Sequence, residues 1–297
     1  MKVLITGAAG FIGRYVAAEF SMAGHEVSAF DVARPADSSL TWVRGDFTQL
    51  DDIVTATEGM DAVCHVGAIG DVNLAFADPP LAAAVNVTGT ANVLEAAIRA
   101  GVKRFVYAST WEVYGPPQYQ PVDESHPCAP DHPYNITKLS GDLLTQSYRE
   151  FKGLDTVCLR LGTAYGVGMR DTAVLPAFIR RASQGRPVTL FGSGEQFRQF
   201  THASDIARGF RLAAENEQPE PTYNLVAHEQ VSIAQVAEFV GRHIPIEIDR
   251  QPPRVGDVSP AVISSAAAEH DLGWHAQVEF AKGAEELLAV YASDRQG

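Results

Sequence analysis

The opening thirteen residues, MKVLITGAAGFIG, constrain the fold of this chain more than any other stretch. A short apolar run ends in Thr6, and glycines follow at three-residue spacing at positions 7, 10 and 13. A buried strand that turns sharply into a helix leaves unpaired N–H groups at the positive end of the helix dipole, where phosphate binds well. The glycines permit the turn, the approach of the phosphate and close packing of helix on sheet. The pattern predicts a dinucleotide-binding turn, with a ligand-free turn as the alternative.

Two features of the next residues support the dinucleotide interpretation. Apolar residues recur at helical spacing over 12–23 before Gly24, which predicts a helix directly after the turn. A second apolar run, EVSAFD, ends in Asp31, 18 residues after Gly13. An acidic residue at the end of the second strand is placed to accept hydrogen bonds from the ribose hydroxyls of a dinucleotide.

Composition limits the class of protein. The chain has 297 residues, 46% of them hydrophobic, which is enough for one large domain or a main domain with a smaller one. Against 36 Asp and Glu residues stand 23 Lys and Arg residues, so the net charge of −13 disfavours nucleic acid and anionic membranes as partners. Gly7 and Gly10 interrupt the N-terminal apolar run, and no stretch approaches 18 consecutive apolar residues. We therefore expect neither a signal peptide nor a membrane span.

The three cysteines are odd in number and widely spaced. Cys64 and Cys158 lie in strand-like apolar runs, so we expect reduced core thiols and a cytoplasmic protein. Cys128 lies with His126 and His132 in a proline-rich loop. This group lacks a fourth ligand at metal-binding spacing, so we expect no metal site.

Strand-like and helix-like stretches alternate over the first half of the chain. The alternation predicts an α/β fold, a Rossmann-type doubly wound parallel sheet with a smaller C-terminal substrate-binding subdomain. We expect residues 1–165 to form the dinucleotide-binding domain, a segment near 199–229 to return to it, and residues 166–198 and 230–297 to form the subdomain. Ligands bind beyond the carboxyl ends of parallel strands. One crevice should therefore be lined by the residues at these ends: Asp31, Asp46, Gly67, Ala68 and Thr110.

A tyrosine and a lysine suited to acid–base chemistry follow the proline-rich loop. Tyr134 and Lys138 lie four residues apart on an expected helix and share one face. An ammonium beside a phenol favours the phenolate, so we expect the pKa of Tyr134 to fall toward a value suited to a general base. Thr110 is placed to hold the same substrate hydroxyl. Tyr148 and Lys152 repeat the spacing, but only the first pair directly follows the loop from the crevice.

Further motifs follow in a fixed order. The N-terminal half contains TGAAGFIG, Asp31, GDF at Asp46, NVTGT at Asn86, ASTWEVYG at Thr110 and YNITK at Tyr134. The C-terminal half contains LRLGTAYG, GSGEQFRQFTHASDIA, RVGD and DLGW. In this order, over nearly the whole chain, the sequence resembles the extended short-chain dehydrogenase/reductase family. Within it, the chain is similar to the nucleotide-sugar epimerases and dehydratases, the UDP-glucose 4-epimerase-like enzymes among them.

The resemblance implies NAD as the cofactor and Thr110, Tyr134 and Lys138 as the catalytic residues. In the implied mechanism Tyr134 removes a proton from a sugar hydroxyl, Lys138 also holds the nicotinamide ribose, and Thr110 polarises the oxygen, while the carbon gives hydride to the nicotinamide. The acidic Asp31 favours NAD over NADP, a preference that Arg34 tempers. The implied cofactor-binding residues are Gly7, Ala9, Gly10, Phe11, Ile12, Gly13, Asp31, Asp46, Phe47, Val66, Gly67, Ala68, Asn86, Ala108, Tyr134 and Lys138.

The resemblance also implies a substrate site. Arg198 and Arg254 match positions that hold a nucleotide diphosphate by charge-assisted hydrogen bonds. Trp111 and Glu112 directly follow the catalytic threonine and are expected beside the substrate, with core packing as the alternative for the tryptophan. Thr163 stands where many relatives carry an asparagine that contacts the nucleotide, so the identity of the nucleotide stays open.

We therefore expect an NAD-dependent nucleotide-sugar epimerase that acts at C4 through a 4-keto intermediate. In 4,6-dehydratases an aspartate commonly occupies the position of Trp111, and an indole cannot protonate a leaving hydroxyl. A 4,6-dehydratase, a sugar oxidoreductase and a decarboxylase of the same family remain alternatives, as does a non-catalytic NAD-binding sensor. The family usually forms homodimers through two helices, here near 81–100 and around Tyr134, so a homodimer is expected.

Overall fold

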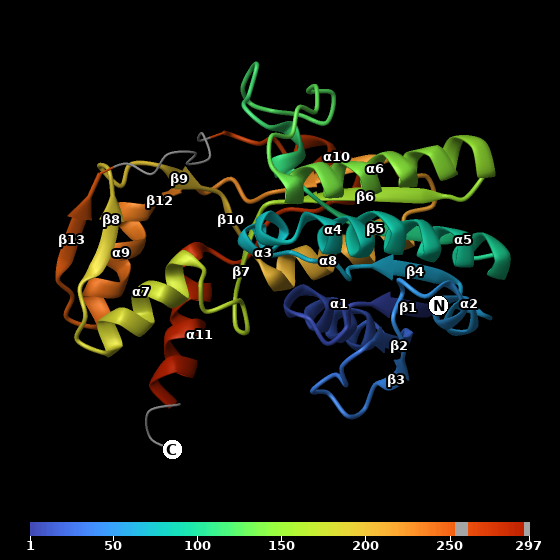
Figure 1. Ribbon diagram of the computed structural model, residues 1–297, viewed down its shortest axis with the longest axis horizontal. Coiled ribbons are helices and arrows are strands. Elements are labelled where there is room, and N and C mark those ends of the chain that lie inside the picture. Colours follow the sequence, from blue (N-terminus) through green and yellow to red (C-terminus); the bar gives the residue numbers. More distant parts are fainter. Residues whose placement is uncertain (253–260, 294–297) are drawn as a thin grey trace.

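A seven-stranded parallel sheet forms the centre of the computed structural model, which describes residues 1–252 and 261–293. Its strand order is β11-β6-β5-β4-β1-β2-β3 (Figure 1). The strands are β1 (Lys2–Thr6), β2 (Glu26–Asp31), β3 (Thr41–Arg44), β4 (Ala62–His65), β5 (Arg104–Thr110), β6 (Thr156–Leu161) and β11 (Thr222–Leu225). Chain order reverses direction at β1, as in a doubly wound Rossmann-type sheet. The predicted fold class is confirmed.

Helices cover both faces of this sheet, because side chains on a strand alternate between the two faces. Val3 and Ile5 belong to the apolar core that includes α1 and α8 residues, whereas Leu4 belongs to the core with α2 and α5. The helices on the first face are α1 (Phe11–Met22) and α8 (Ala203–Glu215). Those on the second face are α2 (Leu50–Thr57), α5 (Thr90–Ala100) and α6 (Pro133–Lys152).

Two elements from the C-terminal half join this sheet. Strand β11 pairs with β6 in parallel register, with Thr222 opposite Cys158. Helix α8 packs beside α1, and Arg211 of α8 binds Glu19 of α1 at 2.8 Å. The sheet is therefore completed by residues far from its other strands in sequence.

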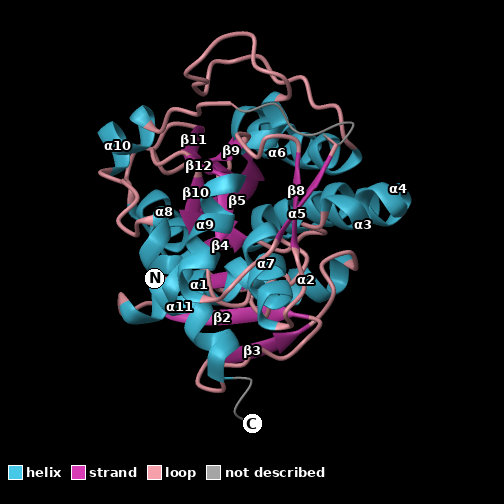
Figure 2. Ribbon diagram, turned by 90° about the vertical axis from the view of Figure 1, so that its left-hand side faces the viewer, coloured by secondary structure: helices cyan, strands magenta, loops and turns pink. Residues whose placement is uncertain are grey.

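A smaller lobe lies beside the main sheet (Figures 1 and 2). Its apolar core joins residues of α7 (Val174–Ser183), β8 (Val188–Phe191), α9 (Ile233–His243) and α11 (Phe280–Ser293). β8 pairs with β13 (Ile248–Gln251). Helix α9 begins with a capping box in which Ser232 and Gln235 bond each other's backbone N–H groups. The short remaining elements are α3 (Val72–Ala77), α4 (Pro79–Ala83), η1 (Ala84–Gly89), η2 (Trp111–Tyr114), β7 (Thr163–Tyr165), β9 (Phe197–Arg198), β10 (Phe200–His202), β12 (Val231–Ser232) and α10 (Ala266–Leu272).

One helical stretch of the described chain, Pro79–Ala100, has the length and hydropathy of a membrane-spanning helix. It comprises α4, η1 and α5, and Val93, Leu94 and Ala97 lie in the core beneath the sheet. Core helices of globular proteins pass the same test, and 44% of the apolar window is buried inside the fold. The stretch is therefore weak evidence for a membrane span.

The close approach of α1 to the glycine turn makes a prediction about stability. A Cβ on Gly13 would lie 2.0 Å from the Gly7 carbonyl oxygen, so Gly13→Ala must push the helix away from the turn. We expect a loss of about 1–3 kcal/mol in the free energy of unfolding, measured by urea denaturation. Gly70→Ala is the matched control, because a Cβ there meets open space, and its effect should stay within about 0.5 kcal/mol. Equal losses in the two variants would contradict the assignment.

Candidate active site

A cavity of about 910 Å³ lies where the glycine turn, the ends of β2, β4 and β5, the start of α6 and the smaller lobe meet. Its size suits a cofactor or another extended small molecule. The structure brings most of the predicted site residues to its walls. These are Gly7, Gly10, Phe11, Ile12, Gly13, Asp31, Phe47, Val66, Gly67, Ala68, Ala108, Thr110, Trp111, Glu112, Tyr134, Lys138 and Arg198.

The glycine turn is closed too tightly for any side chain. Gly7 adopts a left-handed φ of 71°, and a Cβ on it would lie 2.5 Å from the Cα of Gly67. Helix α1 then starts at Phe11, with Gly10 as a cap that offers no side-chain hydrogen bond. The first N–H groups of the helix have no side-chain acceptor from this cap and border the cavity, so the turn fits a pyrophosphate.

The carboxylate of Asp31 is fixed at the end of β2. Its Oδ2 accepts the N–H of Ala9 at 3.0 Å, and its Oδ1 accepts the N–H of Ala33 at 3.0 Å. The guanidinium of Arg34 lies 5.7 Å from the centre of the Trp42 ring. Asp31 is thereby oriented at the cavity wall, where it can accept bonds from ribose hydroxyls.

Three predicted cofactor residues act from outside the cavity wall. Ala9 orients Asp31, as described. Asp46 accepts the N–H of Thr48 at 2.9 Å and so shapes the loop after β3. Asn86 is buried and bonds both the N–H and the carbonyl of Ile69, at 2.8 and 3.1 Å, which fixes the loop that follows β4. Arg254, which is expected to hold the substrate and not the cofactor, lies outside the described residues.

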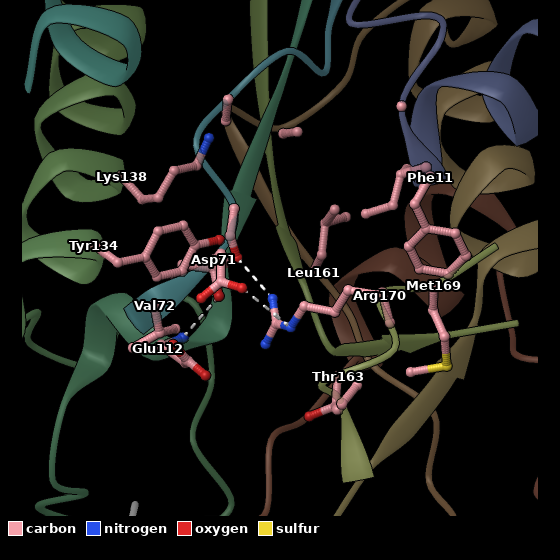
Figure 3. A pocket seen from close by; sticks show the side chains of 18 of the residues that line it. Phe11, Asp71, Val72, Glu112, Tyr134, Lys138, Leu161, Thr163, Met169 and Arg170 are labelled. Carbon is pink, nitrogen blue, oxygen red and sulfur yellow. Dashed lines mark hydrogen bonds and ion pairs between the residues drawn. The ribbon is translucent and has the colours of Figure 1, made fainter. Parts of the chain in front are cut away.

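The predicted catalytic residues come from two elements. Thr110 ends β5, and Tyr134 and Lys138 lie on the first turns of α6, where both point into the cavity (Figure 3). His132 caps this helix, because its Nδ1 accepts the N–H of Tyr134 at 3.2 Å. A hydrogen bond from the side chain of Thr110 also acts on the Tyr134 phenol. The structure therefore brings the three residues together.

The electrostatics of Tyr134 differ from the expectation. Burial raises the pKa of the phenol above its usual range, and the Glu112 carboxylate raises it further. Arg170 and the Thr110 hydrogen bond lower this pKa by less. The prediction that Lys138 would lower the pKa of Tyr134 is wrong, because the loss of hydration outweighs the favourable interactions and the lysine ammonium lies over another ring, that of Tyr107.

Burial also controls the charge of Lys138. Loss of hydration lowers its pKa to about 7, while the negative charge of Asp142 acts in the opposite direction. Lys138 is 3% exposed, so its ammonium is held in a poorly hydrated place. Such a lysine changes its charge near neutral pH.

Three of the residues expected to hold the substrate, Trp111, Glu112 and Arg198, line the same cavity. Glu112 points into it (Figure 3), and burial raises the pKa of this carboxyl while Arg198 and Arg170 lower it. Trp111 lines the cavity but also packs in a small core with Tyr114. The tryptophan therefore packs in a core and also borders the cavity, and its contact with a substrate stays a prediction.

Arg170 lines the cavity and was not predicted. It reaches from the loop before α7 across to Asp71 (Figure 3), donating to the Gly70 carbonyl at 3.0 Å and pairing with Asp71 at 3.9 Å. The contact joins the smaller lobe to the loop after β4. It lies in an irregular segment without a recurring motif, so the sequence carries no signal for it.

The histidines of the proline-rich loop have other partners. His126 Nε2 accepts the N–H of Gln118 at 2.9 Å, and His126 Nδ1 lies 2.7 Å from the Pro127 carbonyl. His132 caps α6. Among residues 1–252 and 261–293, no cluster of three or more His, Cys, Asp or Glu side chains could hold a metal ion.

The fold and the cavity together define a class of protein: a Rossmann-type enzyme with a dinucleotide site beside a Thr–Tyr–Lys group. The chain belongs to the NAD dependent epimerase/dehydratase family, whose sequence model matches residues 3–226. This membership confirms the predicted family and NAD as its cofactor.

Individual relatives fall into two activities. The chain is 30% identical to a dTDP-glucose 4,6-dehydratase of Streptomyces antibioticus, over 99% of this chain and 93% of the relative. It is 28% identical to a UDP-glucose 4-epimerase of Mycolicibacterium smegmatis, over the full length of both. Among solved structures, the UDP-glucose 4-epimerase of Thermotoga maritima with UDP-glucose is 25% identical, with a TM-score of 0.92 over 99% of this chain and all of that one.

The buried lysine makes a prediction about pH and stability. The pKa of Lys138 is about 7 in the folded chain against about 10.5 when hydrated, so between these values the unfolded chain binds more protons and stability rises with pH. Lys138→Met has no buried charge and should be more stable at pH 6, by on the order of 2–4 kcal/mol. The advantage should shrink toward pH 10, as measured by urea denaturation. A difference that is constant from pH 6 to pH 10 would contradict the buried charge.

Proposed function

We propose that this protein is an NAD-dependent nucleotide-sugar epimerase that acts at C4 of the sugar. The observation that carries the proposal is the Thr110–Tyr134–Lys138 group, which lies in the same cavity as the glycine turn. The turn would hold the pyrophosphate of NAD, and Asp31 would accept its ribose hydroxyls. Bound NAD supplies a hydride acceptor that can later return the hydride.

The three residues have separate roles in this proposal. Tyr134 accepts the proton of the sugar 4-hydroxyl as the carbon is oxidised, and returns it when the ketone is reduced from the other face. Thr110 donates or accepts a hydrogen bond at the same oxygen and keeps it beside the phenol. Lys138 would bind the nicotinamide ribose through charge-assisted hydrogen bonds. Burial raises the pKa of Tyr134. The phenol can therefore accept the proton of the sugar hydroxyl only when the complex with bound cofactor and substrate brings positive charge close to it.

The substrate is proposed to be a nucleoside-diphosphate hexose such as UDP-glucose. Arg198 lies on β9 and lines the cavity, and it would pair with the diphosphate, together with Arg254. Glu112 and Trp111 would contact the sugar. The Thermotoga maritima relative binds UDP-glucose, which supports this class of substrate.

Trp111 favours epimerisation over dehydration. Loss of water needs a proton donor for the leaving hydroxyl, and the indole beside Thr110 has no acidic proton for this purpose. Glu112, the residue after Trp111, can serve as a base or a hydrogen-bond partner, but it has no acidic residue beside it in the sequence. A sugar oxidoreductase or decarboxylase would use the same three residues and release NADH, whereas the epimerase retains its cofactor. A non-catalytic NAD sensor has no need of the complete catalytic group.

We further propose that the domain division is 1–165 with the return segment 199–229, and 166–198 with 230–297, and that the enzyme is a cytoplasmic homodimer. Large apolar side chains lie exposed on three neighbouring helices, α3, α4 and α6. They are Leu74, Phe76, Leu81, Ile136 and Leu143. Exposed large apolar side chains on neighbouring helices support a protein interface here.

The catalytic proposal is tested with purified protein and UDP-glucose, followed by proton NMR, which detects UDP-galactose without net change in NADH. The wild type should form this epimer without added NAD. Tyr134→Phe should lose about 10³-fold or more in kcat, because the proton acceptor is gone, while its NAD affinity stays within about twofold.

Tyr148→Phe is the matched control, since Tyr148 and Lys152 have the same spacing on α6 but Tyr148 bonds Glu95 at 3.4 Å, outside the cavity. This variant should keep wild-type turnover. Turnover retained in Tyr134→Phe would refute the mechanism. A 4-keto-6-deoxy product would instead identify a dehydratase, and stoichiometric NADH a net oxidoreductase.

The dimer is tested by sedimentation equilibrium. Leu143 is 56% exposed on α6, and Leu143→Glu would bury a charge in the proposed interface, so the variant should sediment as a monomer. Met22→Glu is the control, because Met22 is 78% exposed at the end of α1, on the other face of the sheet. This control should remain a dimer. If the wild type sediments as a monomer at micromolar concentration, the proposed homodimer is wrong.

A further inference from the structure

Lys138 is held in an unusual setting for a charged side chain. Its ammonium lies 4.3 Å from the centre of the Tyr107 ring, a cation–π distance. Within residues 1–252 and 261–293, no hydrogen bond to its Nζ is formed, and the side chain is 3% exposed. The Tyr107 ring therefore contacts the ammonium of Lys138, which also borders the cavity.

The Tyr107 ring is fixed in place on β5. Tyr107 is fully buried, and its hydroxyl donates to the Lys138 carbonyl at 3.4 Å. Gly141, on the next turn of α6, has no side chain, and a Cβ there would lie 2.2 Å from the Tyr107 hydroxyl oxygen. The His65 ring also packs against the Tyr107 ring, with centroids 5.8 Å apart. The ring can therefore lie beneath Lys138 only because position 141 is a glycine.

A fixed negative charge lies one helical turn after Lys138. Asp142 is fully buried at the i+4 position of α6, on the same face. Its Oδ2 accepts Ser109 Oγ and Arg160 Nε, each at 3.0 Å, and its Oδ1 accepts Gln146 Nε2 at 2.9 Å. These three hydrogen bonds hold the carboxylate in one position.

We propose that Tyr107 and Asp142 are positioning residues that keep Lys138 protonated and directed into the cofactor cavity. Neither side chain lines the cavity itself. The proposal rests on the cofactor-binding role proposed for Lys138. An ammonium makes charge-assisted bonds to ribose hydroxyls, about twice as strong as those of a neutral amine.

The other ionisable groups around Lys138 add little charge of their own, so the protonation of Lys138 depends on Tyr107 and Asp142. His65 is neutral at pH 7, because burial lowers its pKa to about 3. Tyr134 and the Cys158 thiol are protonated, since burial raises the pKa of each. Arg160 offsets part of the charge of Asp142. With the pKa of Lys138 already lowered to about 7, loss of either support makes the amine neutral at pH 7.

The test is an NMR titration of the full chain. It contains five lysines, at positions 2, 103, 138, 152 and 282, so the Cε signals of ¹³C-lysine protein can be assigned by Lys138→Met. The wild-type Lys138 signal should titrate near pH 7. Asp142→Asn should lower this midpoint by about one unit or more, since an opposite charge has been removed.

Tyr107→Leu and Tyr107→Phe separate the ring from the hydroxyl. The phenylalanine keeps the ring, so its midpoint should stay within about 0.3 units of wild type, whereas the leucine should lower it by about one unit. The NAD affinity of Tyr107→Leu, measured by calorimetry, should approach that of wild type at pH 5.5 and fall several-fold below it at pH 7, where wild-type Lys138 is about half protonated and the variant about one tenth. A thermal melt and the signals of the other four lysines report whether Asp142→Asn folds. If it does not fold, Tyr107→Leu alone tests the inference.

A Lys138 midpoint that is unchanged in Tyr107→Leu overturns the inference, and so does an equal shift in the phenylalanine variant. These outcomes are independent of the catalytic proposal. If turnover survives in Tyr134→Phe while the lysine titrates as expected, the proposed mechanism fails and the positioning of Lys138 stands.

Discussion

The structure depends on one close backbone contact, that of the first glycine turn with the loop after β4. A Cβ on Gly7 would lie 2.5 Å from the Cα of Gly67, so position 7 cannot carry a side chain, and Gly13 seats α1 against the carbonyl of Gly7. The side chain of Phe47 fills the space on the other side of Gly67. These contacts join β1, β4 and α1. The backbone of these three elements therefore forms the floor of the cavity independently of the polar side chains. A larger residue at one of these positions would separate all three elements at once.

Buried charged side chains, rather than close backbone contacts, determine the arrangement of the cavity near Lys138. Lys138, Asp142 and Arg160 are each at most 5% exposed, and only the last two form an ion pair. A buried pair of this kind adds little net stability, since desolvation offsets the attraction. The Asp142–Arg160 pair lies near Lys138, for which the described residues offer no ion-pair partner. Its presence is better explained by the negative charge that the Lys138 ammonium requires nearby. The site therefore carries a cost in stability that the apolar cores of the sheet offset.

Much of this arrangement follows from local sequence. The fold class, the turn at Gly7 and the position of Tyr134 on the cavity wall are predictable, because strand–turn–helix patterns and i+4 spacing are local properties. The pKa of Tyr134 was predicted in the wrong direction, since spacing along a helix says nothing about hydration or about Glu112 on another element. Arg170 escaped prediction for a related reason. Its partners Gly70 and Asp71 are about 100 residues away, and only the folded chain brings them near.

The contacts of the smaller lobe explain how two parts of the chain can share one site. The loop before α7 is bonded on one side to α1, where Arg14 and Tyr15 both donate to the Val167 carbonyl, and on the other side to the loop after β4 through Arg170. Both anchors lie beside segments that form the floor of the cavity. The lobe is thus positioned by the same elements that would hold the pyrophosphate, and it places Arg198 on the wall of the same cavity. Change in this loop would alter the substrate end of the cavity while leaving the glycine turn intact.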